Sequence, residues 1–468
     1  MHYISTRGNR TQFTYNEILL KGLSEDGGLF VPTSWPKFSH TQLKKMQGLD
    51  YATLATKVIS KFTNNTFNEG EVLKICQRVY RSFDHNDVAP LKQINKNDYL
   101  LELFHGPTLA FKDYAMQFLS FDFERVLKSL NQKALILGAT SGDTGSAALN
   151  AFAGNSEIDI FILFPKGRVS AIQEAQMTSI IADGAHAIQI EGDFDDCQEI
   201  VKEIFLDHKF RQRVNLSAIN SINWARLMPQ IVYYFFAALK LGAPNKKVSF
   251  SVPTGNFGNI FAGFCAYKMG LPIDKLICAS NRNNILSRYF NSGKMERQNI
   301  EPSLSPSMDI QVSSNFERLL FDIYDRNSSL VRLKMKEFRE KGVFKVDKEP
   351  FRKHANLFAA YSLSDQEILK EISRIHKLSN LLIDPHTACG TFAAYKARIN
   401  KEVDEETPLI SLACAHPCKF PEAVEKATGI QSKLPESMKN LLKKETKSLF
   451  APADANTIKS LIEGHRRD

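Results

Sequence analysis

The stretch Val248-Ser249-Phe250-Ser251-Val252-Pro253-Thr254-Gly255-Asn256-Phe257-Gly258-Asn259 decides the fold class of this chain. Its first five residues are typical of a short buried strand, and the apolar residues that follow at helical spacing predict a helix (Ile260, Phe261, Phe264 and Met269). Gly255 and Gly258 let the backbone turn with its amides converging at the start of that helix, where the dipole favours an anion. The stretch therefore predicts a strand, an anion-binding loop and a helix, the basic unit of an α/β fold.

The loop differs from the two best-known phosphate-binding loops. No Gly-Lys-Ser/Thr ends it, so it is not a Walker A loop, and it lacks the G-x-G-x-x-G spacing of dinucleotide-binding proteins. We therefore expect it to bind the phosphate of a molecule smaller than a nucleoside triphosphate. For this loop taken alone, a glycine-rich turn without a ligand stays open as the alternative.

A second loop of this kind follows the strand-like run Ala134 to Leu137. It reads Gly138-Ala139-Thr140-Ser141-Gly142-Asp143-Thr144-Gly145 and leads into a helix. Small residues and hydroxyls at a helix N-terminus suit a carboxylate as well as a phosphate. The chain therefore has two candidate anion sites.

Lys112 lies in a nearly uncharged stretch that begins at Gly106-Pro107. Gly-Pro predicts a turn and a helix start, and apolar residues then recur at helical spacing (Phe111, Ala115, Phe118, Leu119 and Phe123), which places Lys112 in the first turns. Apolar neighbours and the positive end of the helix dipole both disfavour an ammonium there, so the free amine can form a Schiff base. On its own, such a lysine is more often a solvated surface residue.

The three features together indicate one chemistry. One loop suits the phosphate of an aldehyde cofactor, the other suits the carboxylate of an amino acid, and an amine stands between them. That combination is typical of pyridoxal phosphate enzymes.

The chain resembles the threonine synthases, a family of the tryptophan-synthase-β-like group of pyridoxal phosphate enzymes (fold type II), in the longer bacterial and fungal form. The matching segments occur in the same order through most of the chain: Ser5-Thr6-Arg7-Gly8, Asp26-Gly27-Gly28-Leu29, the Lys112 segment, Thr140 to Gly145, Asn220-Ser221-Ile222-Asn223-Trp224-Ala225-Arg226, Pro253 to Asn259, Asp384-Pro385-His386-Thr387-Ala388 and Ala415-His416-Pro417. The resemblance implies an α/β fold with two open parallel-sheet domains and a mostly helical N-terminal region.

The resemblance also implies residue roles. Lys112 matches the Schiff-base lysine. The other cofactor-binding positions would be Gly255, Asn256, Phe257, Gly258, Asn259, Asp143 and Cys414. The substrate-binding positions would be Thr140, Ser141, Gly142, Thr144, Asn220, Asn223 and Arg226. The planar guanidinium of Arg226 would suit the phosphate of O-phosphohomoserine.

Cys414 departs from the family pattern, which usually has a hydroxyl residue at this position near the pyridine nitrogen. A thiol is a weak donor and a weak acceptor, so we expect a weaker hydrogen bond to that nitrogen, or one from another residue.

The implied reaction converts O-phospho-L-homoserine and water to L-threonine and phosphate by γ-elimination and β-addition, the last step of threonine biosynthesis, with Lys112 as general base. Two alternatives stay open. One is a related phospholyase that releases phosphate from another phosphorylated amino acid without forming threonine. The other is a non-catalytic protein of the same fold, against which Lys112 and the Gly255 loop argue.

The length of 468 residues predicts two or three domains. We expect an N-terminal region over 1–95, an α/β domain over 96–240 with Lys112 and the carboxylate loop, and a larger α/β domain over 241–468 with the phosphate loop. Strands alternating with helices predict parallel sheets; the strand candidates are Ala134–Leu137, Ile158–Phe164, Ala187–Glu191, Val248–Val252, Leu276–Ala279, Leu381–Asp384 and Leu409–Leu412. The run Asn281–Asn315 predicts a long loop that becomes ordered when substrate binds.

Charge and composition exclude other partners. The net charge of +9 lies largely in helix-like runs such as Arg332 to Lys353, where basic residues alternate with apolar ones, so nucleic acid is not expected. No apolar run is long enough for a membrane span, and the N-terminus does not read as a signal peptide. Seven scattered cysteines favour a reducing cytoplasm, and we expect a monomer or homodimer.

Five residues near the C-terminal motifs are of metal-ligand types: His386, Cys389, Cys414, His416 and Cys418. Their spacing does not fit a standard zinc site, and both clusters follow candidate buried strands, where thiols often pack as small apolar groups. No metal is therefore expected.

Overall fold

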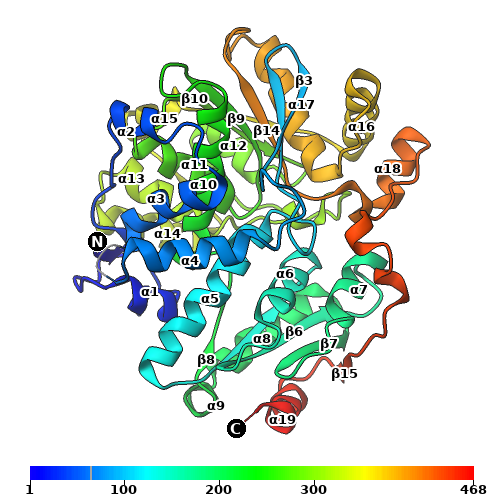
Figure 1. The fold of residues 1–468 in the computed structure, drawn as a ribbon. Helices are drawn as coiled ribbons and strands as arrows, with labels where there is room; N and C mark the ends of the chain where they lie inside the picture. Colours follow the sequence, from blue (N-terminus) through cyan, green and yellow to red (C-terminus); the bar gives the residue numbers. More distant parts are fainter. Residues whose placement is uncertain (64–65, 468) are drawn as a thin grey trace.

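The computed structural model describes residues 1–63 and 66–467 and contains two open β-sheets with helices packed around them (Figure 1). The five-stranded sheet is parallel throughout, in the order β15-β7-β6-β5-β8. Its strands are β5 (Ala134–Ala139), β6 (Ile158–Pro165), β7 (Ala185–Glu191), β8 (Leu216–Ser217) and β15 (Leu449–Pro452). The central strand β6 is buried at all eight positions, as expected for a parallel strand covered on both faces.

The six-stranded sheet has the order β13-β10-β9-β14-β4-β3. Only the edge strand β3 is antiparallel to its neighbour. The strands are β3 (Leu91–Asn95), β4 (Asp98–Glu102), β9 (Val248–Pro253), β10 (Ile273–Ser280), β13 (Phe358–Ser362) and β14 (Leu409–Ala413). Because β9 and β14 are parallel neighbours, the loops after their carboxyl ends emerge at the same edge of the sheet.

The N-terminal region is mostly helical, as the sequence predicted. It contains α1 (Tyr15–Lys21), α2 (His40–Lys45), α3 (Tyr51–Thr63) and α4 (Glu69–Tyr80), with a short pair of strands, β1 (Tyr3–Ser5) and β2 (Phe30–Pro32). The helices that follow are α5 (Lys112–Leu130), α6 (Asp143–Phe152), α7 (Ala171–Thr178), α8 (Phe194–Leu206), α9 (His208–Arg213), α10 (Trp224–Lys240) and α11 (Gly258–Lys268). Helix α10 is buried at every residue except its last and packs against α3, α5 and α11, so it connects the N-terminal region to both sheets.

The C-terminal half adds α12 (Ile285–Ser292), α13 (Phe316–Ile323), α14 (Ser328–Lys341), α15 (Lys348–Ala355), α16 (Asp365–Ser379), α17 (Pro385–Ile399), α18 (Pro421–Thr428) and α19 (Ala455–His465). Strands β11 (Lys294–Glu296) and β12 (Val343–Lys345) pair with each other, and short 3-10 turns occur at η1 (Pro306–Met308), η2 (Pro417–Lys419), η3 (Glu436–Met438) and η4 (Leu441–Lys443).

Two local predictions were wrong. Leu381–Asp384 is not a strand but an irregular lead into α17, because Asp384 caps that helix through its side chain and Pro385 occupies the first helical position. The run Asn281–Asn315 is not one long loop, since it contains α12, β11 and η1. Ile285, Leu286 and Tyr289 lie at helical spacing and are buried, which explains the helix there.

The domain boundaries at 95 and 240 stay a prediction. Two strands, β4 and β15, join a sheet outside the range to which the sequence assigned them. Strand β4 follows residue 95 and joins the sheet that holds the phosphate loop. Strand β15, near the C-terminus, joins the sheet built from residues 134–217. In Figure 1 the chain end, drawn in red, accordingly lies beside β7 and α8. A division of the sequence into consecutive domains cannot predict that β4 and β15 join the other sheet, because local composition marks neither pairing.

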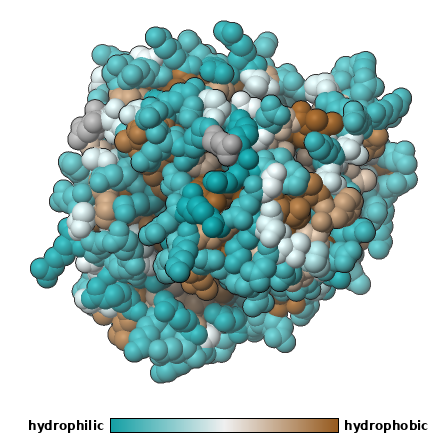
Figure 2. Space-filling view, turned by 90° about the horizontal axis from the view of Figure 1, so that it is seen from below, coloured by the Kyte–Doolittle hydropathy of each residue, from teal (hydrophilic) through white to brown (hydrophobic). Residues whose placement is uncertain are grey.

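The face shown in Figure 2 is mostly hydrophilic, with separate hydrophobic areas. Large apolar side chains that reach solvent, such as Leu206 and Phe450, belong to different elements. Among the described residues, none of the helices combines the length and apolarity that a membrane span requires.

Candidate active site

Lys112 is the first residue of α5 and is buried, with only 8% of its surface exposed. Its Nζ lies 3.2 Å from Asp143 Oδ2 and 5.1 Å from the centre of the Phe111 ring. The position at the helix start and the aromatic neighbour agree with the sequence prediction. The carboxylate partner was not anticipated, because the sequence assigned Asp143 to the loop and not to the lysine.

The backbone before Lys112 is bonded to the backbone around Cys414. Phe111 N–H donates to Cys414 O at 2.8 Å, His416 N–H donates to Leu109 O at 3.0 Å, and Ala110 and Ala415 form an isolated antiparallel bridge. Two segments some three hundred residues apart in sequence therefore meet at the lysine. The structure thus brings Lys112, Asp143 and Cys414 together.

Asp143 begins α6 and is almost completely buried. Besides Lys112, its carboxylate accepts from Lys419 Nζ and Gln173 Nε2, each at 2.8 Å from Oδ1. Burial alone would raise the pKa of this carboxyl, but Lys112, Lys419 and His386 nearby hold the pKa well below its usual value. Asp143 is therefore a carboxylate at neutral pH.

The carboxylate loop (residues 140–145) has backbone donors available. Thr140 Oγ1 accepts from Gly142 N–H and Gly145 N–H at 3.0 and 2.8 Å, which folds the loop. Within the described chain the N–H groups of Ser141, Asp143 and Thr144 donate to no protein acceptor. Gly142 has φ +135°, and a Cβ there would lie about 2.4 Å from Gln173 Cδ, so only glycine fits. Such a loop can bind an anionic group through its amides.

The phosphate loop (residues 254–259) follows β9 and leads into α11. None of the N–H groups of residues 255–259 donates to an acceptor within the described ranges, and the buried Nδ2 of Asn259 also has no partner. Phe257 has φ +62°, a strained angle for a bulky residue, and it is held there by packing against Phe316, Phe290 and Phe358. The loop thus presents converging donors at a helix N-terminus, the arrangement that binds phosphate.

A covering segment (residues 301–315) packs over the phosphate loop. Ser313 Oγ donates to Gly255 O at 2.7 Å, and Asn315 N–H donates to Asn256 O at 3.0 Å. On the other side, a Cβ on Gly255 would lie 3.1 Å from Ser307 O and 3.2 Å from Met308 Cα. The loop conformation therefore depends on this segment.

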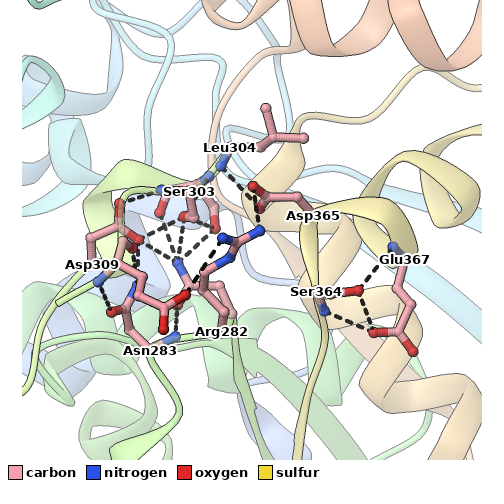
Figure 3. Close-up of polar contacts among 11 residues, drawn as sticks. Arg282, Asn283, Ser303, Leu304, Asp309, Ser364, Asp365 and Glu367 are labelled. Atoms are coloured by element: carbon pink, nitrogen blue, oxygen red, sulfur yellow. Dashed lines mark hydrogen bonds and ion pairs between the residues drawn. The ribbon is translucent and has the colours of Figure 1, made fainter. Parts of the chain in front are cut away.

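Figure 3 shows the polar network that holds the covering segment. Asp309 is its centre, since it accepts from Asn281 Nδ2, Asn283 Nδ2 and Ser303 Oγ at 2.6 to 2.9 Å. Arg282 reaches Asp365 at 2.9 Å, which also accepts from Leu304 N–H at 3.2 Å. The segment is thus tied to the end of β10 and the start of α16.

Of the three residues expected to contact substrate at the start of α10, only Arg226 has a buried side-chain donor without a partner among the described residues. Asn220 is exposed, and Asn223 uses its side chain to cap α10 and to bond Leu19 O. Arg226 is buried and donates from Nη1 to Ile219 O at 2.9 Å, while its Nε has no partner within the described chain. Burial lowers the pKa of Arg226 to about 10, so it is still charged at neutral pH.

Helix α10 links Arg226 to the phosphate loop. Gln230 Nε2 donates to Arg226 O at 2.7 Å, and the hydroxyl of Tyr233 lies between Gln230 Oε1 and Asn259 Oδ1 at 3.2 and 2.6 Å. These bonds join the α10 backbone at Arg226 to the side chain of Asn259 in the phosphate loop.

Cys414 is a buried, neutral thiol. Its Sγ lies 3.7 Å from Leu412 O, and its N–H donates to Thr387 Oγ1 at 3.2 Å. Burial, and then the charge of Asp384, raise the pKa of this thiol well above its usual value. It follows β14, so it emerges at the same sheet edge as the phosphate loop.

Sequence reasoning missed three partners in the site. Lys419 and Gln173 bind Asp143, and His386 lies between the Asp384 carboxylate (2.7 Å from Nδ1) and Ser307 N–H (3.3 Å from Nε2). Lys419 lies two residues after the Ala415-His416-Pro417 motif, so its position close to that motif was a signal. Gln173 lies in the first turn of α7, where Ser170 and Gln173 form a capping box, a pattern that predicts a helix start and not a contact with Asp143. In the part of the chain that the structure describes, no group of three or more His, Cys, Asp and Glu side chains could hold a metal.

The residues fit pyridoxal phosphate. The unpaired amides and the orphaned Asn259 Nδ2 suit its phosphate, Lys112 suits its aldehyde, and the Cys414 thiol can face its ring without introducing a charge. The site lies where the carboxyl ends of β9 and β14 meet the loop after β5, the usual position for ligands in open α/β sheets.

Three family models match the chain. They are threonine synthase N terminus over residues 2–80, pyridoxal-phosphate dependent enzyme over residues 88–341, and threonine synthase C-terminal over residues 387–462. A threonine synthase of Pseudomonas aeruginosa is 46% identical over 99% of this chain and 98% of its own length. The crystal structure of a PLP-bound threonine synthase from Brucella melitensis covers both chains completely with TM-score 0.97 and 44% identity. The yeast threonine synthase structure has TM-score 0.94 and 37% identity, covering 99% of this chain and 98% of that one.

Proposed function

The chain belongs to the threonine synthase family of pyridoxal phosphate enzymes, and on that premise we propose that it converts O-phospho-L-homoserine and water to L-threonine and phosphate. The observation that carries the proposal is the buried Lys112, which is paired with Asp143 of the carboxylate loop and bonded through Phe111 to the end of β14, the sheet edge where the phosphate loop with its unpaired amides begins. The alternative is the related phospholyase that releases phosphate without forming threonine, and the assay below distinguishes the two.

Pyridoxal phosphate, when bound, supplies an aldehyde that forms a Schiff base with an amine and a ring that withdraws electrons from the substrate α-carbon. The chain supplies the rest. Residues 255–259 bind the cofactor phosphate through backbone N–H groups, and the N–H groups of residues 141, 143 and 144 bind the amino-acid carboxylate. Arg226 Nε is the free buried donor that suits the phosphate of the substrate.

Lys112 is the proton carrier of the proposed reaction. As a free amine it takes the α-proton of the substrate, and once it has released that proton within the site it takes a proton from Cβ. The Cγ–O bond breaks and phosphate leaves with the electron pair, and the Cβ proton passes from Lys112 to Cγ. The oxygen of water then bonds to Cβ as its proton goes to the released phosphate, and Cα regains the first proton. Lys112 can move these protons because its Nζ, at the start of a rigid helix, is held by a single ion pair that it can leave.

The test is incubation of the purified protein with O-phosphohomoserine, with threonine and phosphate assayed separately. Equal amounts of the two products are expected. Phosphate in excess over threonine would support the alternative phospholyase, and neither product would contradict both.

We also propose a cytoplasmic location and a monomeric or homodimeric state. All seven cysteines are buried, unpaired thiols, which supports a reducing compartment. Fractionation of cells and light scattering of the purified protein test the two points.

A further inference from the structure

Lys419 is a second lysine of the site and has no exposed surface. Its Nζ lies 2.8 Å from Asp143 Oδ1 and 2.8 Å from the carbonyl oxygen of Thr108. Transfer of an ammonium from water to a protein interior is strongly unfavourable unless a carboxylate pairs with it. Lys419 is therefore fixed by Asp143, and Asp143 is equally fixed by Lys419.

Asp143 serves two lysines through its two oxygens. Oδ2 is 3.2 Å from Lys112 Nζ, and Oδ1 is shared by Lys419 and the neutral Gln173. The charged or titratable groups that act on this carboxylate come from several elements: Lys112 on α5, Lys419 on η2, His386 on α17 and the Cys414 thiol after β14. Among them, Lys419 is the cation that takes no part in the proposed chemistry. The buried Asp113 on α5 faces Lys419.

A Schiff-base lysine reacts as an uncharged amine. While Lys112 is engaged in this way, it no longer offers a charge to Asp143. Without Lys419 the buried carboxylate would then have no lysine cation beside it and would tend to take up a proton. A protonated Asp143 would donate a hydrogen bond where it now accepts, and the site would change its charge during the reaction.

We propose that Lys419 is a positioning residue that keeps Asp143 ionised and in place while Lys112 is engaged with cofactor or substrate. The inference rests on the Schiff-base role proposed for Lys112, but not on the identity of the substrate. Lys419 itself transfers no proton, since its Nζ is held by Asp143 and Thr108.

The test is a pH titration of the cofactor absorbance in the purified holoenzyme and in Lys419→Met, which keeps the length of the side chain and removes its charge. Loss of one cation beside Asp143 raises the pKa of that carboxyl, so the acid-side change of the spectrum should move to higher pH by about 1 unit or more. An acid-side change at the same pH in both proteins would overturn the proposal.

Lys268→Met is the matched control, because Lys268 is also ion-paired, to Asp322 at 3.1 Å, but lies at the far end of α11 from the phosphate loop. Its titration should coincide with that of the unchanged protein. A shift as large as that of Lys419→Met would show a general effect of lost ion pairs and would overturn the proposal.

A second readout needs neither cofactor nor activity. Thermal unfolding of the apoprotein is compared for Lys419→Met, Asp143→Asn and the double variant. Each single change leaves an uncompensated buried charge or a weakened pair, so the double variant should have a higher Tm than the sum of the two single losses predicts. Additive losses of Tm would contradict the coupling between Lys419 and Asp143. This comparison holds even if Lys419→Met binds no cofactor. Failure of threonine formation by the unchanged protein would instead contradict the proposed function and leave both Lys419 readouts intact.

Discussion

The N–H of Phe111 donates to the carbonyl oxygen of Cys414 at 2.8 Å, so the residue before Lys112, the proposed Schiff-base lysine, is bonded directly to the thiol residue. The thiol is buried, and Asp384 and Asp143 both act on it electrostatically. A group at position 414 therefore shares the environment of Lys112, and its charge matters more than its size.

Cys414→Ser should be nearly silent, because it replaces one small neutral group with another of the same shape. Cys414→Asp places a third carboxylate beside Asp384 and Asp143, and should change the cofactor spectrum and slow threonine formation relative to side reactions. Absorbance spectra and product ratios of both variants check this. If Cys414→Asp folds and leaves spectrum and products unchanged, Cys414 does not face the cofactor ring.

Arg226→Lys should raise KM for O-phosphohomoserine roughly ten- to hundredfold, the range expected when a hydrogen bond to a charged group is lost, about 1.5–3 kcal/mol. Lysine keeps the charge but lacks the Nε donor that is unpaired here. The affinity for pyridoxal phosphate should change little. Steady-state kinetics and cofactor titration separate the two effects. Arg398→Lys, which alters an ion pair with Asp98, is the control, and an unchanged KM in Arg226→Lys would remove Arg226 from the site.

Gly255→Ala tests the covering segment. The new Cβ would lie 3.1 Å from Ser307 O and 3.2 Å from Met308 Cα, which are backbone atoms with little freedom to move. We expect about 1–3 kcal/mol of strain and a cofactor Kd raised at least about tenfold. Gly464→Ala, where a Cβ meets nothing within 4 Å, is the control and should keep the original Kd. Equal Kd values for the two variants would show that the covering segment does not shape the loop.

His416 predicts a pH dependence of stability. Burial, and then the charge of His105, lower the pKa of His416 from 6.5 to about 4 in the folded protein. Between pH 6.5 and about 4 the unfolded chain binds a proton that the folded chain does not, so stability is lost as pH falls through this window. The contribution reaches about 3 kcal/mol at the acid end.

His416→Asn removes this contribution and can still accept from Cys418 N–H, as Nδ1 does at 3.2 Å. Denaturant unfolding at pH 7 and pH 4.5 should therefore show a smaller difference in the variant than in the unchanged protein. His40→Asn, at an exposed position, is the control. A pH difference unaltered by His416→Asn would contradict the buried neutral imidazole.

Local patterns predicted the strands and helices that carry the site. The apolar run Val248–Val252 became β9, and the apolar spacing after Gly106-Pro107 placed Lys112 at the first residue of α5. These predictions succeeded because a buried strand, or a helix with one buried face, requires apolar residues at a regular spacing that can be recognised in the sequence. The strand prediction for Leu381–Asp384 was wrong because a short apolar run before a helix-capping Asp and a Pro has the same pattern as a short strand.

The pairings within the site could not be predicted from the sequence. Lys419 meets Asp143 only because η2 and the start of α6 are brought together by the fold, and no sequence period records a contact across 276 positions. The pairing of β15 with β7 in the five-stranded sheet could not be predicted for the same reason. Contacts between single polar residues that lie far apart in sequence can be identified only from the structure.

The central claim is that Lys112 is the Schiff-base lysine, and borohydride reduction of the holoenzyme followed by peptide mapping tests it most directly. Lys112 and Lys419 bind the two oxygens of one carboxylate, so the experiment must distinguish them. The account predicts a stable pyridoxyl group on Lys112, and loss of the cofactor absorbance in Lys112→Ala. A pyridoxyl group on Lys419, or on any other lysine, would contradict it.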